Sequence, residues 1–587
     1  MTQLAAAARA RPVHFIILLA FGIFLTWPAL TTGYVPSRDI LIHLLWSSRF
    51  SDQLWAGTWY PRWLDTMNGG LGSPVFFFYP PLPYFFTAAL KPLFYADPEG
   101  WRQLGVAASL AVILSGFGAY GWLRRLTGAS AALAGAIVYM GAPYHLATDL
   151  YDRFAFAELW SFVWLPLVLW GVQAVAGGSR KAFPGLALAY AALILTHLPT
   201  TMIFSPVALA YAIFCSRREV RMRRSLAVAA AMTLGAGLAA VFLLPVLLTQ
   251  QNISLADMRV GRFSYIYNFL YYGPRFDAAF DADFTRMLEQ LGRYAGALAL
   301  GSLFAFFLGR QAGAVSGAWR ARFWLLVAVL SFAMMLPPAR PVWDMLPPLQ
   351  AIQFPWRFNA LLTLALAPLI ALWLDSGKPQ VSGAHRVALW VVGLAVVGQS
   401  LLILPIYLAL GATPGAASMD KVLVQLGSRN EEAKEKVLAA KLAIDTMEYR
   451  PRWAPRAVND SSQALHATLS RIAAAGPGQG RVSIVSRSPR RMVLEVDMPA
   501  AGWARVPHFY YPEWRASLAP GGVPLPIRPA AEDGLIEIQL EAGRRNIVLT
   551  LEPSLAEKLG WGLSGFSVLV LGFLLLRLRR SNESAGA

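Results

Sequence analysis

Long apolar segments constrain this chain more than any other feature. Several runs of about 17–25 residues carry few charges, and a helix of that length crosses the ~30 Å hydrocarbon core of a bilayer. Of the 587 residues, 56% are hydrophobic and only 14% are charged. A soluble domain does not contain so many apolar runs of this length. The sequence therefore predicts a mainly α-helical, polytopic membrane protein.

The positive charge lies between the apolar runs. The formal net charge is +18, and most arginines form short clusters. The positive-inside rule explains such clusters as cytoplasmic loops. Because no basic and aromatic module accompanies the charge, nucleic acid is not expected as a partner. A single cysteine, Cys215, excludes an internal disulfide.

Placing every basic loop in the cytoplasm gives about twelve spans, with both termini on that side. They are 13–30, 103–122, 130–147, 155–176, 182–198, 200–216, 225–249, 294–310, 323–338, 357–375, 386–411 and 559–577. Segment 74–95 is also apolar, but Pro80, Pro81 and Pro83 break helical hydrogen bonding there. We expect a broken or interfacial segment on the outer side. The alternative is a thirteenth span.

The outer face carries the long loops. Residues 1–411 are expected to form the transmembrane domain, with a large first outer loop at 31–102. Residues 412–556 read as a periplasmic soluble domain, helical over 419–475 and then an alternating pattern over 480–555 that predicts a small β-sandwich. Residues 557–587 hold a final transmembrane helix and a basic cytoplasmic tail. Function is therefore expected on the outer side of a multi-pass protein of the bacterial inner membrane, in contact with its lipids.

Asp39 and His43 lie one helical turn apart in the first outer loop. One interpretation is local, because an acid in the first turn of a helix gains ~0.3–1 kcal/mol from the helix dipole. The other is a reactive pair at the membrane face. Glycines and aromatic residues follow in the same loop, and such residues suit both an interfacial belt and a sugar face.

The second outer loop and the next helix carry Asp149, Asp152, Arg153 and Glu158. An ionisable group inside an apolar run costs ~2.5–3.5 kcal/mol on insertion scales, which makes Glu158 a functional candidate. The structural alternative is a pair of Glu158 with Arg153 or with a neighbouring helix. Hard oxygen ligands on Asp39, Asp149 and Asp152 would suit a divalent cation such as Mg²⁺ or Mn²⁺.

The remaining candidates are spread along the outer face. His197 ends a span and is either a helix-terminal group or a site residue. Arg357 opens another span, where it would bind a phosphate bidentately or snorkel to the interface. Arg62 and Tyr151 complete the candidate substrate-binding set. Phosphate-binding loops, dinucleotide fingerprints and hydrolase elbows are absent from the sequence.

Several ordered motifs together resemble the GT-C superfamily of integral membrane glycosyltransferases. Within it, the chain looks like the bacterial proteins called "6-pyruvoyl-tetrahydropterin synthase-related" and, more distantly, the YfhO type. The motifs are R-D-I-L-I-H at 38–43, W-Y-P-R-W at 59–63, N-G-G-L-G-S-P at 68–74, F-Y-P-P-L at 78–82, A-P-Y-H-L-A-T-D-L-Y-D-R-F-A-F-A-E at 142–158, L-T-H-L-P at 195–199, I-Q-F-P-W-R-F at 352–358 and Y-Y-P-E-W-R-A at 510–516.

The resemblance implies an acid in the first outer loop that acts as a base or positions a metal, which here is Asp39. It implies a second acidic site, matching Asp149 and Asp152, and a periplasmic domain that helps to bind an acceptor. Because the first motif carries one acid and not a pair, metal dependence stays open. The expected activity is transfer of a sugar from a polyprenyl-phosphate donor to a glycan or glycolipid acceptor. A lipid-linked glycan flippase and a non-catalytic envelope scaffold are the alternatives.

Overall fold

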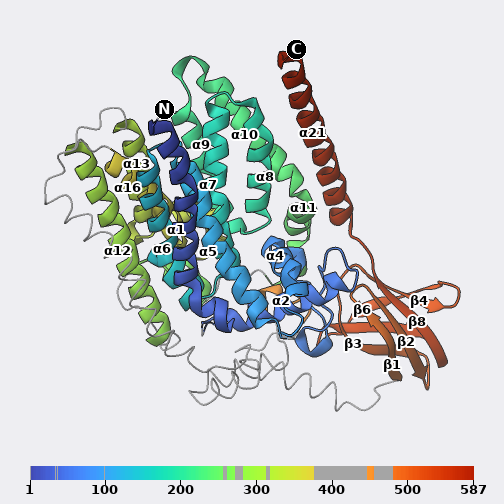
Figure 1. The fold of residues 1–587 in the computed structure, drawn as a ribbon. Helices are drawn as coiled ribbons and strands as arrows, with labels where there is room; N and C mark the ends of the chain where they lie inside the picture. Colours follow the sequence, from blue (N-terminus) through green and yellow to red (C-terminus); the bar gives the residue numbers. More distant parts are fainter. Residues whose placement is uncertain are drawn as a thin grey trace.

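A bundle of long helices carries a β-domain at one end (Figure 1). The computed structural model describes residues 2–254, 261–271, 282–311, 318–375, 446–454 and 480–586, apart from 34, 36 and 98. Both chain termini lie at the end of the bundle that is opposite the β-domain (Figure 1). This arrangement agrees with the expectation that both termini face the same side of the membrane.

Seven of the described helices are long and apolar enough to cross a membrane, and nine if each of two bent helix pairs is one span. The single helices are α1 (Thr2–Thr32), α5 (Trp101–Leu123), α7 (Phe156–Ala176), α9 (Leu198–Cys215), α12 (Ala282–Gln311), α16 (Asn359–Asp375, with η12, Pro355–Phe358, before it) and α21 (Leu555–Gly586). The bent pairs are α10 (Arg221–Leu238) with α11 (Ala240–Thr249), and α13 (Ala318–Met334) with α14 (Arg340–Met345).

Two predicted spans form shorter helices. They are α6 (Ala129–Gly141), with 13 residues, and α8 (Phe183–Ile194), with 12. The predicted span 386–411 lies outside the described residues. A multi-pass membrane protein is therefore confirmed, whereas the total of about twelve spans stays a prediction.

Helix α5 lies at the centre of the bundle and packs against α1, α6 and α7. Its Gly105 lets the backbones of α1 and α5 meet, because a Cβ at that position would lie 2.2 Å from the carbonyl oxygen of Ala29. Small residues allow this kind of approach where lipid supplies no hydrophobic driving force between helices. Most residues of α7 and α16 are buried by their neighbours, so both helices can hold polar groups away from lipid.

Segment 74–95 is broken, as its prolines predict. It forms α3 (Val75–Phe78), α4 (Leu82–Leu90) and the 3₁₀ turn η2 (Lys91–Leu93). Nine residues of α4 rise about 14 Å, which is under half of the hydrocarbon core. Helix α4 packs against α2 (Ile40–Trp55), beside the β-domain (Figure 1).

The β-domain contains two antiparallel sheets. The sheet orders are β1-β2-β8-β4-β5 and β3-β7-β6. The strands are β1 (Arg481–Ser488), β2 (Arg491–Met498), β3 (Gly502–Phe509), β4 (Trp514–Ala519), β5 (Pro524–Leu525), β6 (Ile527–Pro529), β7 (Leu535–Leu540) and β8 (Gly543–Leu551). Alternate residues of β2 and β3 are buried in one hydrophobic core that both sheets share. The predicted helical part, 419–475, lies outside the described residues except for 446–454.

The β-domain core extends into the first outer loop. Trp63, Leu71 and Phe77 from that loop belong to the same buried cluster. The backbone N–H of Phe509 donates to the carbonyl of Leu71 at 2.8 Å, and Arg487 donates to the carbonyl of Gly70 at 2.7 Å. The β-domain is therefore packed against the transmembrane domain.

Candidate active site at the β-domain end of the bundle

The first and second outer loops meet through backbone pairing. The N–H of Arg38 donates to the carbonyl of Asp152 at 3.0 Å, and the N–H of Asp39 donates to that of Arg153 at 2.9 Å. Asp39 is the N-cap residue of α2, but its side chain makes no capping hydrogen bond. Its carboxylate instead lies within electrostatic reach of the Arg153 guanidinium and the Tyr79 hydroxyl. Asp39 thus begins a helix and faces the ionic cluster of the second loop.

A π-helical segment, η3 (Tyr144–Asp152), precedes α7. Its wider turn is uncommon and often occurs at functional sites. The segment directs Tyr144 toward Glu158, and the tyrosine hydroxyl donates to Oε1 at 2.7 Å. The second loop therefore reaches the start of α7 inside the bundle.

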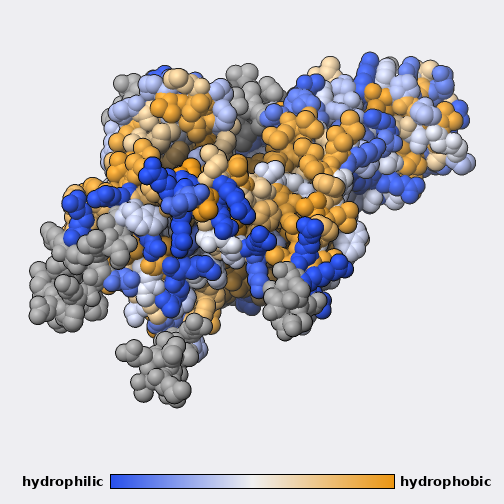
Figure 2. Space-filling view, turned by 90° about the horizontal axis from the view of Figure 1, so that it is seen from above, coloured by the Kyte–Doolittle hydropathy of each residue, from blue (hydrophilic) through white to orange (hydrophobic). Residues whose placement is uncertain are grey.

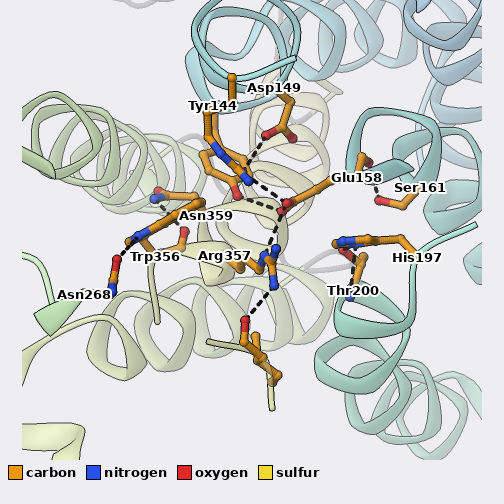
Figure 3. A network of polar contacts seen from close by, with 12 residues as sticks. Tyr144, Asp149, Glu158, Ser161, His197, Thr200, Asn268, Trp356, Arg357 and Asn359 are labelled. Carbon is orange, nitrogen blue, oxygen red and sulfur yellow. Dashed lines mark hydrogen bonds and ion pairs between the residues drawn. The ribbon is translucent and has the colours of Figure 1, made fainter. Parts of the chain in front are cut away.

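Glu158 is the centre of the cluster (Figure 3). Its Oε2 lies 3.5 Å from Nη1 of Arg153 and 3.5 Å from Nε of Arg357, and its side chain is 1% exposed. A buried carboxylate needs such partners, because an isolated buried charge costs several kcal/mol. The structure thus has the expected pair with Arg153 and adds Arg357 from η12, the turn before α16.

Aromatic rings hold both guanidinium groups. Arg153 lies over the Trp356 ring at 4.7 Å and Arg357 over the Phe354 ring at 4.9 Å, while the two rings stack at 4.7 Å. The Trp356 indole donates to Asn268 at 3.0 Å. Stacking orients a planar guanidinium in a way that a lysine ammonium cannot reproduce. The two cations are therefore fixed in orientation before any ligand binds.

Asp149 and Asp152 lie in different environments. Asp149 is fully buried, and its nearest cation is Nη1 of Arg153 at 3.9 Å. Among the described residues, neither carboxylate oxygen of Asp149 has a hydrogen-bond partner. Asp152 is partly exposed and pairs with Arg38 at 3.4 Å.

The tentative metal site does not fit this arrangement. No three His, Cys, Asp or Glu side chains gather closely enough to hold a metal ion anywhere in the described ranges. Asp39, Asp149 and Asp152 are all within those ranges. No step below is therefore assigned to a metal.

The two candidate histidines have local partners. The Nδ1 atom of His43 bonds the hydroxyl of Tyr84 at 2.7 Å inside a cage of aromatic rings. His197 caps α9, and its Nδ1 bonds the Thr200 hydroxyl at 2.7 Å. The His197 ring also points toward Glu158 (Figure 3). His197 is thus both a helix-terminal group and a neighbour of the cluster.

Arg62 and Tyr151 lie outside the cluster. The Tyr151 hydroxyl donates to the carbonyl of Leu25 at 2.5 Å, which joins η3 to α1. Arg62 is buried against Glu557 of α21, with 3.1 Å between Nε and Oε1, and it donates to the carbonyl of Val241 at 2.6 Å. These contacts give both residues structural roles, and the substrate contacts expected from the sequence stay a prediction.

Tyr79, Tyr144, Trp356 and Asn268 also belong to the site and were not among the predicted residues. Tyr79 lies in the proline-broken segment, whose aromatic residues suited both an interfacial belt and a sugar face. Trp356 directly precedes Arg357, and Tyr144 lies in the same sequence motif as Glu158, so closeness to these charged residues along the chain could have found both. Tyr449 packs on the rings of Trp46 and Tyr79, with centroids 5.8 and 5.6 Å apart. No local signal connects Tyr449 to this site.

The family model "Bacterial membrane protein YfhO" matches residues 66–418, more than half of the chain. The chain belongs to the YfhO family. This match confirms the resemblance to the YfhO type that the ordered motifs indicated.

Two solved structures are distantly similar to this YfhO-family chain. The archaeal oligosaccharyltransferase AglB from Archaeoglobus fulgidus, in complex with an inhibitory peptide and a dolichol-phosphate, is 11% identical with a TM-score of 0.44, and the match covers 76% of this chain and 61% of AglB. ArnT from Cupriavidus metallidurans bound to undecaprenyl phosphate is 13% identical with a TM-score of 0.33, covering 82% and 97%. Similarity this distant says nothing about which residues act. No curated protein sequence matches the chain.

Proposed function

We propose that this YfhO-family protein is a GT-C-type glycosyltransferase of the bacterial inner membrane. It moves a sugar from a polyprenyl-phosphate donor to a lipid-linked or cell-envelope glycan acceptor at the periplasmic face. The observation that carries the proposal is the pair of ring-stacked arginines, Arg153 and Arg357, that share Glu158 opposite Asp39.

The charges of the cluster suit a lipid phosphate. Glu158 shares its carboxylate between the two guanidinium groups. Asp149 and Asp39 lie near Arg153, so Arg357 has fewer acidic neighbours and is the cation more available to an anion. Arginine forks bind phosphate oxygens bidentately. A fixed cation next to a leaving phosphate stabilises charge that develops in the transition state and pays little reorganisation cost. Arg153 and Arg357 are therefore assigned to the donor phosphate.

Asp39 is assigned as the general base. In the proposed step, Asp39 takes the proton of an acceptor hydroxyl, and that oxygen forms a bond to the anomeric carbon. The bond between the anomeric carbon and the phosphate oxygen breaks, and its electron pair leaves with the polyprenyl phosphate. A positioned base contributes about 10²–10⁴-fold to such a rate.

The test measures release of polyprenyl phosphate from a panel of polyprenyl-phosphate sugars by the purified protein. Asp39→Asn should lower release at least about 100-fold. Asp52→Asn is the matched control, because Asp52 lies near the end of the same helix and pairs with Lys91 at the surface. Equal activity of Asp39→Asn and Asp52→Asn would remove the assignment of the base.

The same experiment separates the enzyme from the two alternatives. A flippase moves the intact lipid-linked sugar and releases no polyprenyl phosphate, whereas a scaffold does neither. The scaffold would be favoured if Asp39→Asn fully restored the glycan of a deletion strain while the purified protein released no lipid phosphate.

A further inference from the structure

An apolar groove runs along the outside of the bundle between α4, α7 and α8. Its volume is about 610 Å³, and most of its lining is carbon. It lies on the face of α7 that carries Trp164, Gly171 and Ala174, so the buried Glu158 cluster is not part of it.

Small residues make the groove and large rings close it. Gly171 of α7 packs closely on Leu186 of α8, because a Cβ at Gly171 would lie 2.9 Å from the Leu186 Cβ, and Ala174, Gly185 and Ala189 also line the groove. A Cβ at Gly185 would meet no atom within 4 Å. Toward the β-domain end, Phe86 of α4 also lines the groove and stacks on the rings of α7. The groove therefore ends at α4.

The length of the groove matches one leaflet of the membrane. Its lining on α7 runs from Trp164 to Ala174. Ten residues of helix rise about 15 Å, which is half of the ~30 Å hydrocarbon core. A groove of this length holds the acyl chain of a lipid whose headgroup lies at the end away from α4.

The headgroup end of the groove is basic. Arg125 lines it, with its guanidinium 5.8 Å from the Trp170 ring centre. Arg180 and Lys181 belong to the turn η4 (Arg180–Ala182) and lie between the lining residues Ser179 and Ala182. Figure 2 views the end of the molecule that carries the termini, where hydrophilic residues gather over the helix ends. The positive-inside rule assigns this end to the cytoplasm, whose leaflet carries anionic lipids.

We propose that this groove binds one anionic phospholipid of the cytoplasmic leaflet. Its acyl chain lies along α7 and α8, and its phosphate contacts Arg125 and the Arg180-Lys181 turn. This site is separate from the glycosyl-transfer proposal and does not depend on it.

The test is native mass spectrometry of the full chain released from nanodiscs of phosphatidylglycerol or phosphatidylcholine. The wild type should retain one phosphatidylglycerol in preference to phosphatidylcholine. Gly185→Leu should lose the retained lipid, because the leucine side chain starts in open space, where its Cβ meets no atom within 4 Å, and extends into the groove. Its control is Gly562→Leu on α21, another position where a Cβ meets nothing within 4 Å.

Arg125→Gln tests the headgroup contact. It should lower the preference for phosphatidylglycerol about fivefold, the effect of roughly one basic residue near a lipid surface. Its control is Arg577→Gln, since Arg577 also lies over an aromatic ring but on α21. Retention of phosphatidylglycerol by Gly185→Leu, equal retention of both lipids by the wild type, or a polyprenyl phosphate that the wild type retains and Gly185→Leu loses would each overturn the proposal. A rise in Tm on adding phosphatidylglycerol, present in the wild type and lost in Gly185→Leu, checks the same site in folded protein.

Discussion

The buried ion pair between Arg62 and Glu557 joins the first outer loop to α21. The two side chains are 1% and 2% exposed, and Arg490 of the β-domain reaches the same carboxylate at 2.5 Å. Glu557 also caps its own helix, because its Oε2 accepts the N–H of Ser554 at 3.1 Å and its N–H donates to the Ser554 hydroxyl. Glu557→Gln keeps a capping acceptor and removes only the charge.

We expect Glu557→Gln to lower the free energy of unfolding by about 3–5 kcal/mol, the usual cost of breaking a buried pair from one side. The cost falls on Arg62, which keeps its bond to the carbonyl of Val241 but has almost no contact with water. Arg490 is 28% exposed and can be hydrated. The double variant Arg62→Met/Glu557→Leu should recover most of the loss, since apolar residues replace buried pairs at little cost.

The assay is reversible unfolding of the full chain in mixed micelles, followed by tryptophan fluorescence. Glu495→Gln is the control, because Glu495 pairs with Arg544 on the exposed face of the β-domain and such a pair contributes about 0–1 kcal/mol. The reasoning is refuted if Glu557→Gln and Glu495→Gln have the same effect. A large loss of polyprenyl phosphate release with unchanged stability would instead restore the substrate role first expected for Arg62.

Three further outcomes are expected. Arg153→Lys keeps the charge but loses the stacking on Trp356, so release of polyprenyl phosphate should fall more than about tenfold while the fold is unchanged by circular dichroism. Burial, together with the nearby Arg487, lowers the pKa of His508 from 6.5 to about 3. The unfolded chain therefore binds more protons below pH 6.5, and the free energy of unfolding should fall by about 2 kcal/mol at pH 5, with less pH dependence in His508→Asn. Gly105→Val would place a side chain between the backbones of α1 and α5 and push the two helices apart, so little folded protein should be recovered in size-exclusion chromatography.

The sequence predicted the parts of the fold that follow from local composition. Apolar length and the arginine clusters placed a helix in every predicted span that the structure describes, and the three prolines predicted the break before α4. The convergence of Asp39, Arg153 and Glu158 was also predictable, since outer loops share one face of the membrane. The stacking of Arg153 on Trp356 depends on the rotation of two helices, and charge patterns do not define that rotation.

Other features depend on partners that are remote in the chain. Arg62 stands among aromatic residues that suit sugar binding, but its partner is Glu557 in the last helix. The packing of Tyr449 on Trp46 is of the same kind. The buried faces of the β-strands were predicted from their alternation, whereas the outer-loop residues that complete their core were not. Single-residue patterns contain no information about such distant pairs.

The core shared by the first outer loop and the β-domain also determines when the first outer loop can fold during synthesis. Trp63 and Phe77 leave the ribosome long before strands β1 to β8 are synthesised. Until then, the first loop lacks its apolar partners, and Arg62 lacks Glu557. Assembly of the face that holds Asp39 is therefore expected to wait for the synthesis of β8, and truncation before β8 should leave a membrane-inserted chain whose first outer loop is sensitive to protease.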